Sequence, residues 1–154
     1  MTFAIHTVNE RAIWATPDRV YELAADVTAW PDILSHYRYV RVRSEENGNR
    51  TVEMGARRSG FPVRWTAVQQ PRPEQCEIAY RHTEGITRGM DVLWRIELNA
   101  GRSLTTITHV LHPTAWWLRF KISRWVVGEV FVKAIAEKTL AGIAAHAEQT
   151  GQDR

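Results

Sequence analysis

The feature that most constrains this chain is a run of short segments with alternating side-chain character, from residue 37 to residue 111. Residues with strand preference recur with period two over 37–44, 51–59, 63–70, 76–82, 90–98 and 104–111. Turn signals separate these segments, as in Asn47-Gly48-Asn49, Gly60-Phe61-Pro62, Thr83-Glu84-Gly85 and Asn99-Ala100-Gly101. Strands joined so directly predict an antiparallel meander, because parallel strands need long crossover connections.

A further strand and two short helices are expected before this meander. A strand over 8–14 places Val8, Ala12 and Trp14 on one parity. Thr16 suits an N-cap and Pro17 suits the first helical position, so a helix should begin there. Apolar residues at 20, 23, 24 and 27 repeat at helical spacing and predict a buried stripe. A short second helix is expected over 32–35.

One long helix is expected at the C-terminal end of the chain. No proline occurs between residues 115 and 148, and the apolar positions 118, 122, 125, 132, 136, 140 and 143 lie roughly on one face. A strongly curved sheet can wrap around such a helix and leave a cavity between them. The sequence therefore predicts an α+β fold that forms one ligand-binding domain over residues 1–150.

The composition limits the class of protein. Hydrophobic residues make up 44% of the 154 residues, which is enough for one sizeable core. The most apolar stretch, 125–136, is broken by Glu129 and Lys133, so no segment reaches the ~20 apolar residues of a membrane-spanning helix. The first twelve residues lack the pattern of a signal peptide. The single cysteine, Cys76, excludes an internal disulfide, and we expect a cytoplasmic protein.

Two residue types are unusually frequent. Arginine accounts for 17 of the 20 basic residues, which is typical of anion recognition and equally of a GC-rich genome. The arginines are scattered, the net charge is only +3, and no helix-turn-helix, zinc-finger or RNA-binding signature accompanies them. We therefore expect no nucleic-acid partner. The seven tryptophans direct attention to an apolar, aromatic cavity.

Two segments of the chain resemble the opening of the bacterial polyketide aromatase/cyclases. The first is the sequence VYELAADVTAWP from Val20 to Pro31, and the second is Ile33-Leu34-Ser35-x-Tyr37-x-x-Val40-x-Val42. The stretches 90–97, with Trp94 at the centre, and 101–110 are also similar to that family. These proteins belong to the START/Bet v 1-like (SRPBCC) superfamily, together with lipid-transfer START domains and coenzyme Q-binding proteins.

The resemblance implies a helix-grip fold, in which a curved antiparallel sheet surrounds a long C-terminal helix and an apolar cavity. It also implies an enzyme that folds a poly-β-ketone, promotes an intramolecular aldol condensation and removes water. Such chemistry needs a hydrogen-bond donor for a carbonyl and one base, with no metal and no cofactor. A hydrophobic small molecule is the expected substrate, and an acyl carrier protein is a candidate partner.

Family members carry a tryptophan, a serine and an arginine at alternate positions of the fourth strand. The matching positions here are Trp65, Ala67 and Gln69, so only the tryptophan is retained. Gln69 can still donate an amide N–H to a carbonyl, but it brings no charge. Arg58 is a candidate substitute, because it shares its parity with residues 52, 54 and 56 on the preceding strand. The alternative is that Arg58 reaches solvent at the strand end.

Tyr80 and His82 share their parity with Cys76 and Ile78 and should face the cavity. His82 is the best acid/base candidate because imidazole titrates near neutrality, although a hydrogen-bonded core histidine would look the same. On the last strand we expect residues 104, 106, 108 and 110 to point inward and His109 to point outward. The expected catalytic residues are thus Arg58, Gln69 and His82, and the expected substrate-binding residues are Trp65, Tyr80, Met90, Trp94, Tyr37 and Thr108.

The main alternative is a non-catalytic carrier of a lipid or quinone, which the missing arginine favours. The segment from Trp116 to Lys121 mixes aromatic and basic residues, as membrane-interface helices do. This apolar helix fits four interpretations: peripheral membrane contact, a protein partner, a dimer contact or plain core packing. The sequence leaves the oligomeric state open. The six histidines include no His-x-His or His-x-x-x-His pair, so we expect no metal site.

Overall fold

The computed structural model describes residues 5–58, 60–111 and 132–150. The seven strands are β1 (Ile5–Ile13), β2 (Tyr37–Glu46), β3 (Asn49–Arg58), β4 (Phe61–Arg72), β5 (Glu77–Gly85), β6 (Met90–Asn99) and β7 (Arg102–Leu111). The α-helices are α1 (Pro17–Ala25), α2 (Trp30–Ile33) and α4 (Lys133–Thr150), and two 3₁₀ turns are η1 (Val27–Ala29) and η2 (Pro73–Gln75).

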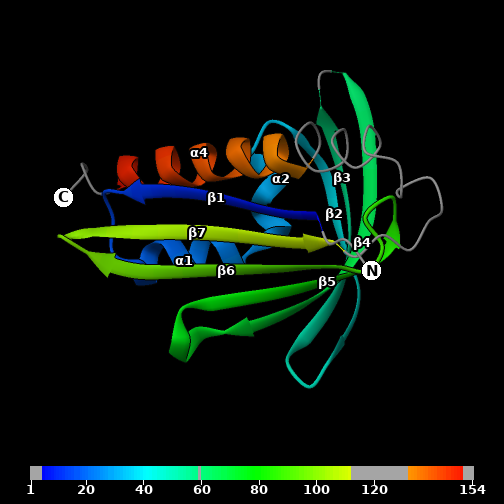
Figure 1. The fold of residues 1–154 in the computed structure, drawn as a ribbon, viewed down its shortest axis with the longest axis horizontal. Coiled ribbons are helices and arrows are strands. Elements are labelled where there is room, and N and C mark those ends of the chain that lie inside the picture. Colours follow the sequence, from blue (N-terminus) through cyan, green and yellow to red (C-terminus); the bar gives the residue numbers. More distant parts are fainter. Residues whose placement is uncertain (1–4, 59, 112–131, 151–154) are drawn as a thin grey trace.

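The strands form one antiparallel sheet in the order β1-β7-β6-β5-β4-β3-β2. Neighbours in the sequence from β2 to β7 are also neighbours in the sheet, as a meander requires, and β1 closes the other edge beside β7. Figure 1 shows that the sheet bends strongly, since β2, β3 and β4 run steeply across the direction of β1, β6 and β7. The α-helices of the described residues pack on this sheet, and α4 contacts α1, α2 and β1. The expected helix-grip architecture is confirmed.

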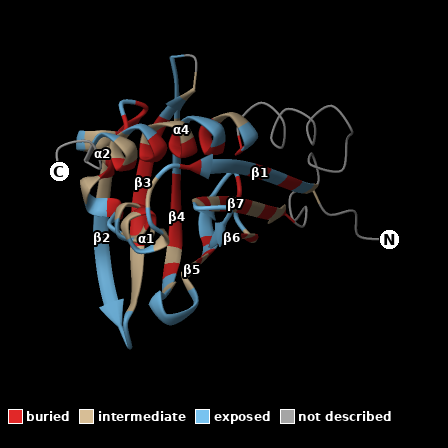
Figure 2. Cartoon of the chain, turned by 90° about the vertical axis from the view of Figure 1, so that its left-hand side faces the viewer, coloured by how far each residue is buried: buried red, intermediate tan, exposed pale blue. Residues whose placement is uncertain are grey.

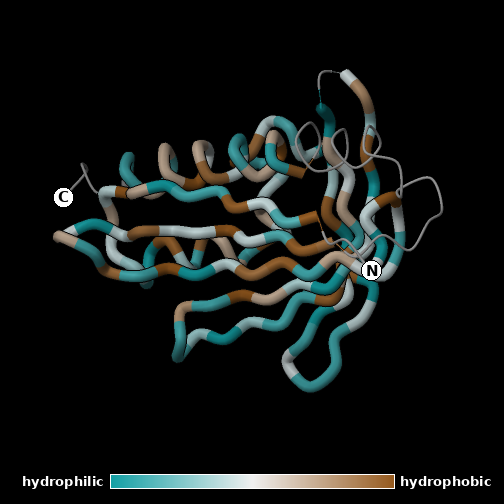
Figure 3. The backbone as a smooth tube through the Cα atoms, in the orientation of Figure 1, coloured by the Kyte–Doolittle hydropathy of each residue, from teal (hydrophilic) through white to brown (hydrophobic). Residues whose placement is uncertain are grey.

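The core lies between the inner face of the sheet and α4. Buried residues alternate with less buried ones along β5, β6 and β7, and residues at helical spacing are buried on α4, where Figure 2 shows them in red. In Figure 3 hydrophobic and hydrophilic positions accordingly alternate along the strands. The buried residues include Val52, Met54, Ala56, Ile78, Val92, Trp94, Ile107, Leu111, Ala136, Leu140, Ile143 and Ala147.

The local signals that start α1 and close the first hairpin act as expected. The Oγ1 of Thr16 accepts a hydrogen bond from the backbone N–H of Arg19 at 3.3 Å, and Pro17 occupies the first helical position. Asn47 and Gly48 both have positive φ, 54° and 80°, which is the geometry of a two-residue hairpin turn that matches strand twist. The first signal fixes where α1 begins, and the second fixes where the chain reverses direction between β2 and β3.

The predicted inward parity of β7 is wrong. On β7 the buried residues are Ser103, Thr105, Ile107, His109 and Leu111, whereas 104, 106, 108 and 110 are only partly buried. On β1, Val8 is 45% exposed and Trp14, just after the strand, is 65% exposed. The exposure of Val8 agrees with this parity, because Val8 pairs with Thr108 and therefore shares its outward face. β7 carries apolar residues on both faces, so its alternation alone does not identify the inner one.

The long predicted helix lies only partly within the described residues. Its C-terminal part is α4, and the structure does not describe 112–131, which contain the aromatic and basic segment 116–121 and His112. No helix in the described part of the chain is long and apolar enough to span a membrane.

Candidate functional site

A pocket lies between the inner face of the sheet and α4. Strands β3 to β7 supply most of its wall, α2 and the start of β2 supply Trp30 and Tyr37, and α4 with the residue before it supplies Val132, Ile135, Ala136 and Thr139. No charged side chain is among the lining residues in the described part of the chain. The remaining lining residues are Met54, Val63, Trp65, Tyr80, His82, Ile86, Thr87, Met90, Val92, Trp94, Ile107 and His109.

Aromatic rings form a continuous series along this wall. Trp94 lies 5.9 Å from Trp30, which meets Tyr37 edge-on at 5.0 Å, measured between ring centroids. Tyr37 in turn lies 6.0 Å from Trp65, and Trp65 stacks on the His82 ring at 5.9 Å with an interplanar angle of 5°. Such contacts fix the rings and present flat apolar faces to a ligand. The predictions that Tyr37, Trp65 and Trp94 face the cavity agree with this geometry.

His82 is buried on β5 and faces the pocket, as the parity of that strand predicts. Its Nδ1 lies 2.7 Å from the Oγ1 of Thr87, in the connection between β5 and β6. Burial, with a smaller contribution from His109, lowers the pKa of His82 to about 3. The ring is therefore neutral at pH 7, with its Nδ1 bound to Thr87 and its side chain on the pocket wall.

His109 is a pocket residue that the sequence reasoning missed. Its strand parity is inward, it is 8% exposed, and burial lowers its pKa to about 4. Its Nδ1 is buried without a hydrogen-bond partner. The pairing of β6 with β7 is the signal that could have identified it. Ile107 lies opposite the buried Trp94, and His109 lies two residues further along β7, so it shares the inward face of Ile107. Two neutral imidazoles thus lie on the wall of one pocket.

Tyr80 and Met90 line the pocket as predicted. Tyr80 is 6% exposed, and its hydroxyl oxygen accepts a hydrogen bond from Nε2 of Gln69 at 3.0 Å. Burial raises the pKa of Tyr80 and of Tyr37 above the usual range, so both phenols keep their protons at neutral pH.

Gln69 points inward, and both ends of its amide are engaged in hydrogen bonds with other protein groups. Its Nε2 also donates to the carbonyl oxygen of Ala25 at 2.9 Å, and its Oε1 accepts from Nε of Arg50 at 3.1 Å. Arg50 donates a second bond to the same carbonyl. This carbonyl is at the last residue of α1, where helical partners are lacking. Gln69 therefore closes the C-terminal end of α1, and it is not among the residues that line the pocket.

Arg58 and Thr108 are also not brought to the pocket. Arg58 follows the inward parity of Val52, Met54 and Ala56 but is half-buried at the end of β3. Thr108 lies on the opposite face of the sheet, so its predicted inward orientation is wrong. Among the predicted catalytic residues, His82 alone is a lining residue.

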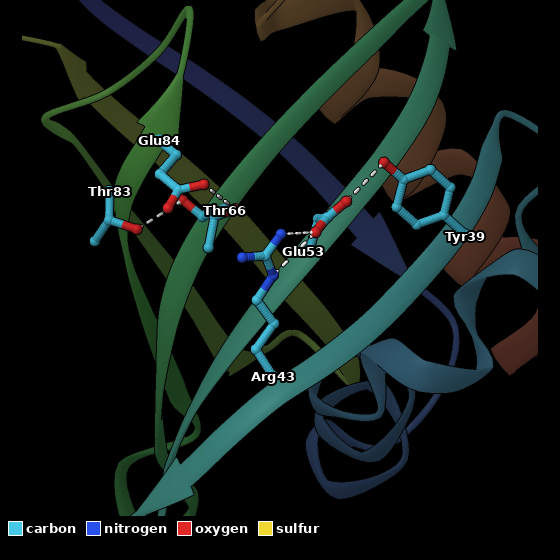
Figure 4. A network of polar contacts seen from close by, with 6 residues as sticks. All are labelled: Tyr39, Arg43, Glu53, Thr66, Thr83 and Glu84. Atoms are coloured by element: carbon cyan, nitrogen blue, oxygen red, sulfur yellow. Dashed lines mark hydrogen bonds and ion pairs between the residues drawn. The ribbon is translucent and has the colours of Figure 1, made fainter.

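A polar network on the outer face supports the strands that carry the site (Figure 4). The carboxylate of Glu53 accepts from Nε of Arg43 at 2.9 Å and from the hydroxyl of Tyr39 at 3.1 Å, and the Arg43 guanidinium lowers the pKa of Glu53. Thr66 donates to Glu84 at 3.2 Å on the neighbouring strands. Glu53 and Thr66 pair with each other and are the chain neighbours of the pocket residues Met54 and Trp65, so the network fixes their register.

The model of the family described as polyketide cyclase/dehydrase and lipid transport matches residues 13–139. The chain belongs to this family. No curated protein sequence matches the chain.

Several solved structures share the fold of this chain. The ZhuI aromatase/cyclase from Streptomyces sp. R1128 is similar with a TM-score of 0.83 and 25% identity, over 96% of this chain and 95% of that one. TTHA0849 from Thermus thermophilus gives a TM-score of 0.80 at 21% identity, over 94% and 98%. The di-domain ARO/CYC BexL from the BE-7585A biosynthetic pathway gives 0.80 at 18% identity, over 94% of this chain and 50% of that one. The family is thus one whose members bind hydrophobic small molecules, which the aromatic pocket suits.

Proposed function

We propose that the pocket binds a poly-β-ketone and promotes its intramolecular aldol cyclisation and dehydration. The observation that carries this proposal is the pair of neutral imidazoles, His82 and His109, on the wall of a pocket with otherwise few polar groups. Membership of the cyclase/dehydrase family and similarity to an aromatase/cyclase support it.

The chemistry matches what neutral imidazoles offer. A methylene between two carbonyls is acidic, so it enolises with help from a weak base or from a donor on the carbonyl oxygen. A neutral imidazole N–H in an apolar site is a strong, pre-positioned donor to a carbonyl or enolate oxygen. With Nδ1 of His82 bound to Thr87, its other nitrogen serves in this role. His109 supplies a second ring on the same wall.

The two steps then balance without a cofactor. In the aldol step the enol carbon forms a bond to a second carbonyl carbon, the enol O–H proton is released, and the new alkoxide oxygen gains a proton. In the dehydration the adjacent carbon loses a proton, the C–O bond breaks and one water leaves. The aromatic walls from Trp94 to Trp65 hold the chain folded, and this positioning supplies much of the rate.

A carrier of a lipid or quinone is the second candidate. It is favoured by the absence of any charged lining side chain in the described part of the chain and by the engagement of Gln69 in the helix end. A site that only holds an apolar ligand needs no more than shape and apolar surface.

The deciding experiment supplies the protein with nascent poly-β-ketone from a minimal synthase and compares the products. We expect the wild type to replace the spontaneous mixture by one cyclised aromatic product. His82→Ala and His109→Ala should each lower that product at least about a hundredfold, the lower end of what a positioned acid or base contributes, whereas His6→Ala, which removes an exposed histidine on β1, should not. A wild type that leaves the spontaneous mixture unchanged contradicts the cyclase proposal. A co-purified lipid or quinone, detected by mass spectrometry, would then favour the carrier.

A further inference from the structure

Four buried polar atoms without a hydrogen-bond partner lie on β1 and β7. They are the Oγ1 of Thr7, the Oδ1 of Asn9, the Oγ1 of Thr105 and the Nδ1 of His109. Their residues are 5%, 2%, 0% and 8% exposed, in that order. Among the described residues only Tyr21 adds a further atom of this kind, through its hydroxyl. A buried polar atom without a partner costs about 1–3 kcal/mol, so four in one place require an explanation.

The sheet register places these four residues next to one another. Thr7 pairs directly with His109, and Asn9 pairs with Ile107, which puts Asn9 diagonal to both His109 and Thr105. Directly paired side chains have Cβ atoms about 5 Å apart and diagonal ones lie about 7–8 Å apart. A water molecule between such side chains can hydrogen-bond to both. Figure 1 shows β1 and β7 side by side next to α4, which contacts β1.

The row of polar side chains leads from the pocket wall to solvent. At the inner end His109 is a lining residue of the pocket. At the outer end the Nδ2 of Asn9 donates to the carbonyl oxygen of Lys133 at 3.2 Å and to Oε2 of Glu137 at 3.1 Å. Glu137 is largely exposed and lies 3.9 Å from Arg11. β1 is the edge strand on this side of the sheet, and α4 packs against it, so the exposed carboxylate of Glu137 is where this row of side chains meets solvent.

We propose that the boundary between β1, β7 and α4 is an internal water site that joins His109 to solvent at Glu137. Ordered water there gives each of the four atoms a partner, and the site offers every water two or more polar groups, which is what a stable buried water needs. A water that donates to Nδ1 of His109 leaves the ring proton on Nε2. Resting on the proposed function, this makes Thr7, Asn9 and Thr105 positioning residues, because they fix the tautomer that His109 presents to the ligand.

The sign of a stability change tests the water site without any substrate. Valine has the shape of threonine without the hydroxyl, so Thr7→Val with Thr105→Val removes two of the four groups. If the site holds water, the remaining waters lose partners, and we expect Tm to fall by about 2–6 °C relative to the control. The control is Thr108→Val, on the outer face of the same strand. A Tm equal to or above that of the control overturns the proposal, because removing an unpartnered hydroxyl from a dry site stabilises a protein.

A second measurement reports on His109 itself. We expect the ¹⁵N spectrum of the wild-type imidazole to show a neutral ring with its proton on Nε2, and Thr7→Val to shift the Nδ1 signal, which Thr108→Val leaves in place. An unchanged Nδ1 signal contradicts the water contact. If Tm and the Nδ1 signal respond as expected but the wild type forms no cyclised product, the water site stands and the cyclase proposal fails.

Discussion

At the scale of single residues, the buried histidines define the chemistry of the site and also its sensitivity to acid. His36 joins His82 and His109 in this respect, since burial lowers its pKa to about 4, and its Nε2 lies 3.0 Å from the hydroxyl of Thr139 on α4. That hydroxyl donates to the carbonyl of Ile135, so it accepts from the His36 ring, whose proton is on Nε2. All three rings are neutral in the folded state at pH 7.

Stability should therefore fall as the pH drops below about 6.5. Between that pH and the folded-state pKa of about 3 or 4, the unfolded chain binds a proton on each histidine that the folded chain does not. Each contributes a slope of about 1.4 kcal/mol per pH unit in that window. We expect the free energy of unfolding, measured by urea denaturation at pH 6 and pH 5, to depend less steeply on pH in His82→Gln. A slope as steep as that of His6→Gln would show that His82 is protonated in the folded state.

A substitution of Gln69 distinguishes a structural role of this residue from a catalytic one. Replacing it with methionine keeps the volume but leaves the Tyr80 hydroxyl and the Ala25 carbonyl with fewer partners. We expect a loss of about 1–3 kcal/mol in the free energy of unfolding. The product distribution at a temperature where the variant is folded should match the wild type. An altered product distribution would show that Gln69 takes part in the reaction.

At the scale of elements, turn and capping signals predicted the meander and the start of α1, because Asn47-Gly48 and Thr16-Pro17 act through local backbone geometry. The sequence did not predict which side of β7 points toward the core. Its inner side carries the polar residues Thr105 and His109, while the apolar Val110 lies on the outer side. Only pairing with the neighbouring strands decides between the two parities, and that information is not local. His109 was missed for this reason.

The close packing of α4 against the end of α2 predicts the effect of a substitution at Gly142. A Cβ built on Gly142 would lie 2.3 Å from Cδ2 of Leu34, whose side chain is 2% exposed. Gly142→Ala gains about 1 kcal/mol in helix propensity but forces a buried side chain to move, which costs about 1–3 kcal/mol. We expect a net loss of about 1 kcal/mol by urea denaturation, relieved in part when Leu34→Val is added. A more stable Gly142→Ala would show that the helix can shift freely over α2.

At the scale of the whole molecule, the bent sheet and α4 enclose an aromatic pocket whose polar groups come from strands far apart in the sequence. β5 supplies His82 and β7 supplies His109, and the sheet order separates them by one strand, β6. No contiguous motif encodes this pair, so the resemblance of residues 20–42 to a family leads to the fold but not to the histidines. Cyclisation in this pocket therefore requires that both rings are neutral and face one ligand.

The most direct test is the ¹⁵N spectrum of the imidazoles at pH 7, recorded with and without a stable hydroxylated polycyclic aromatic ketone as ligand. We predict that His82 and His109 give signals of neutral rings in both spectra and that both signals shift on ligand addition, while those of His6 stay in place. Charged rings at pH 7, or a bound ligand that moves neither signal, would contradict the account.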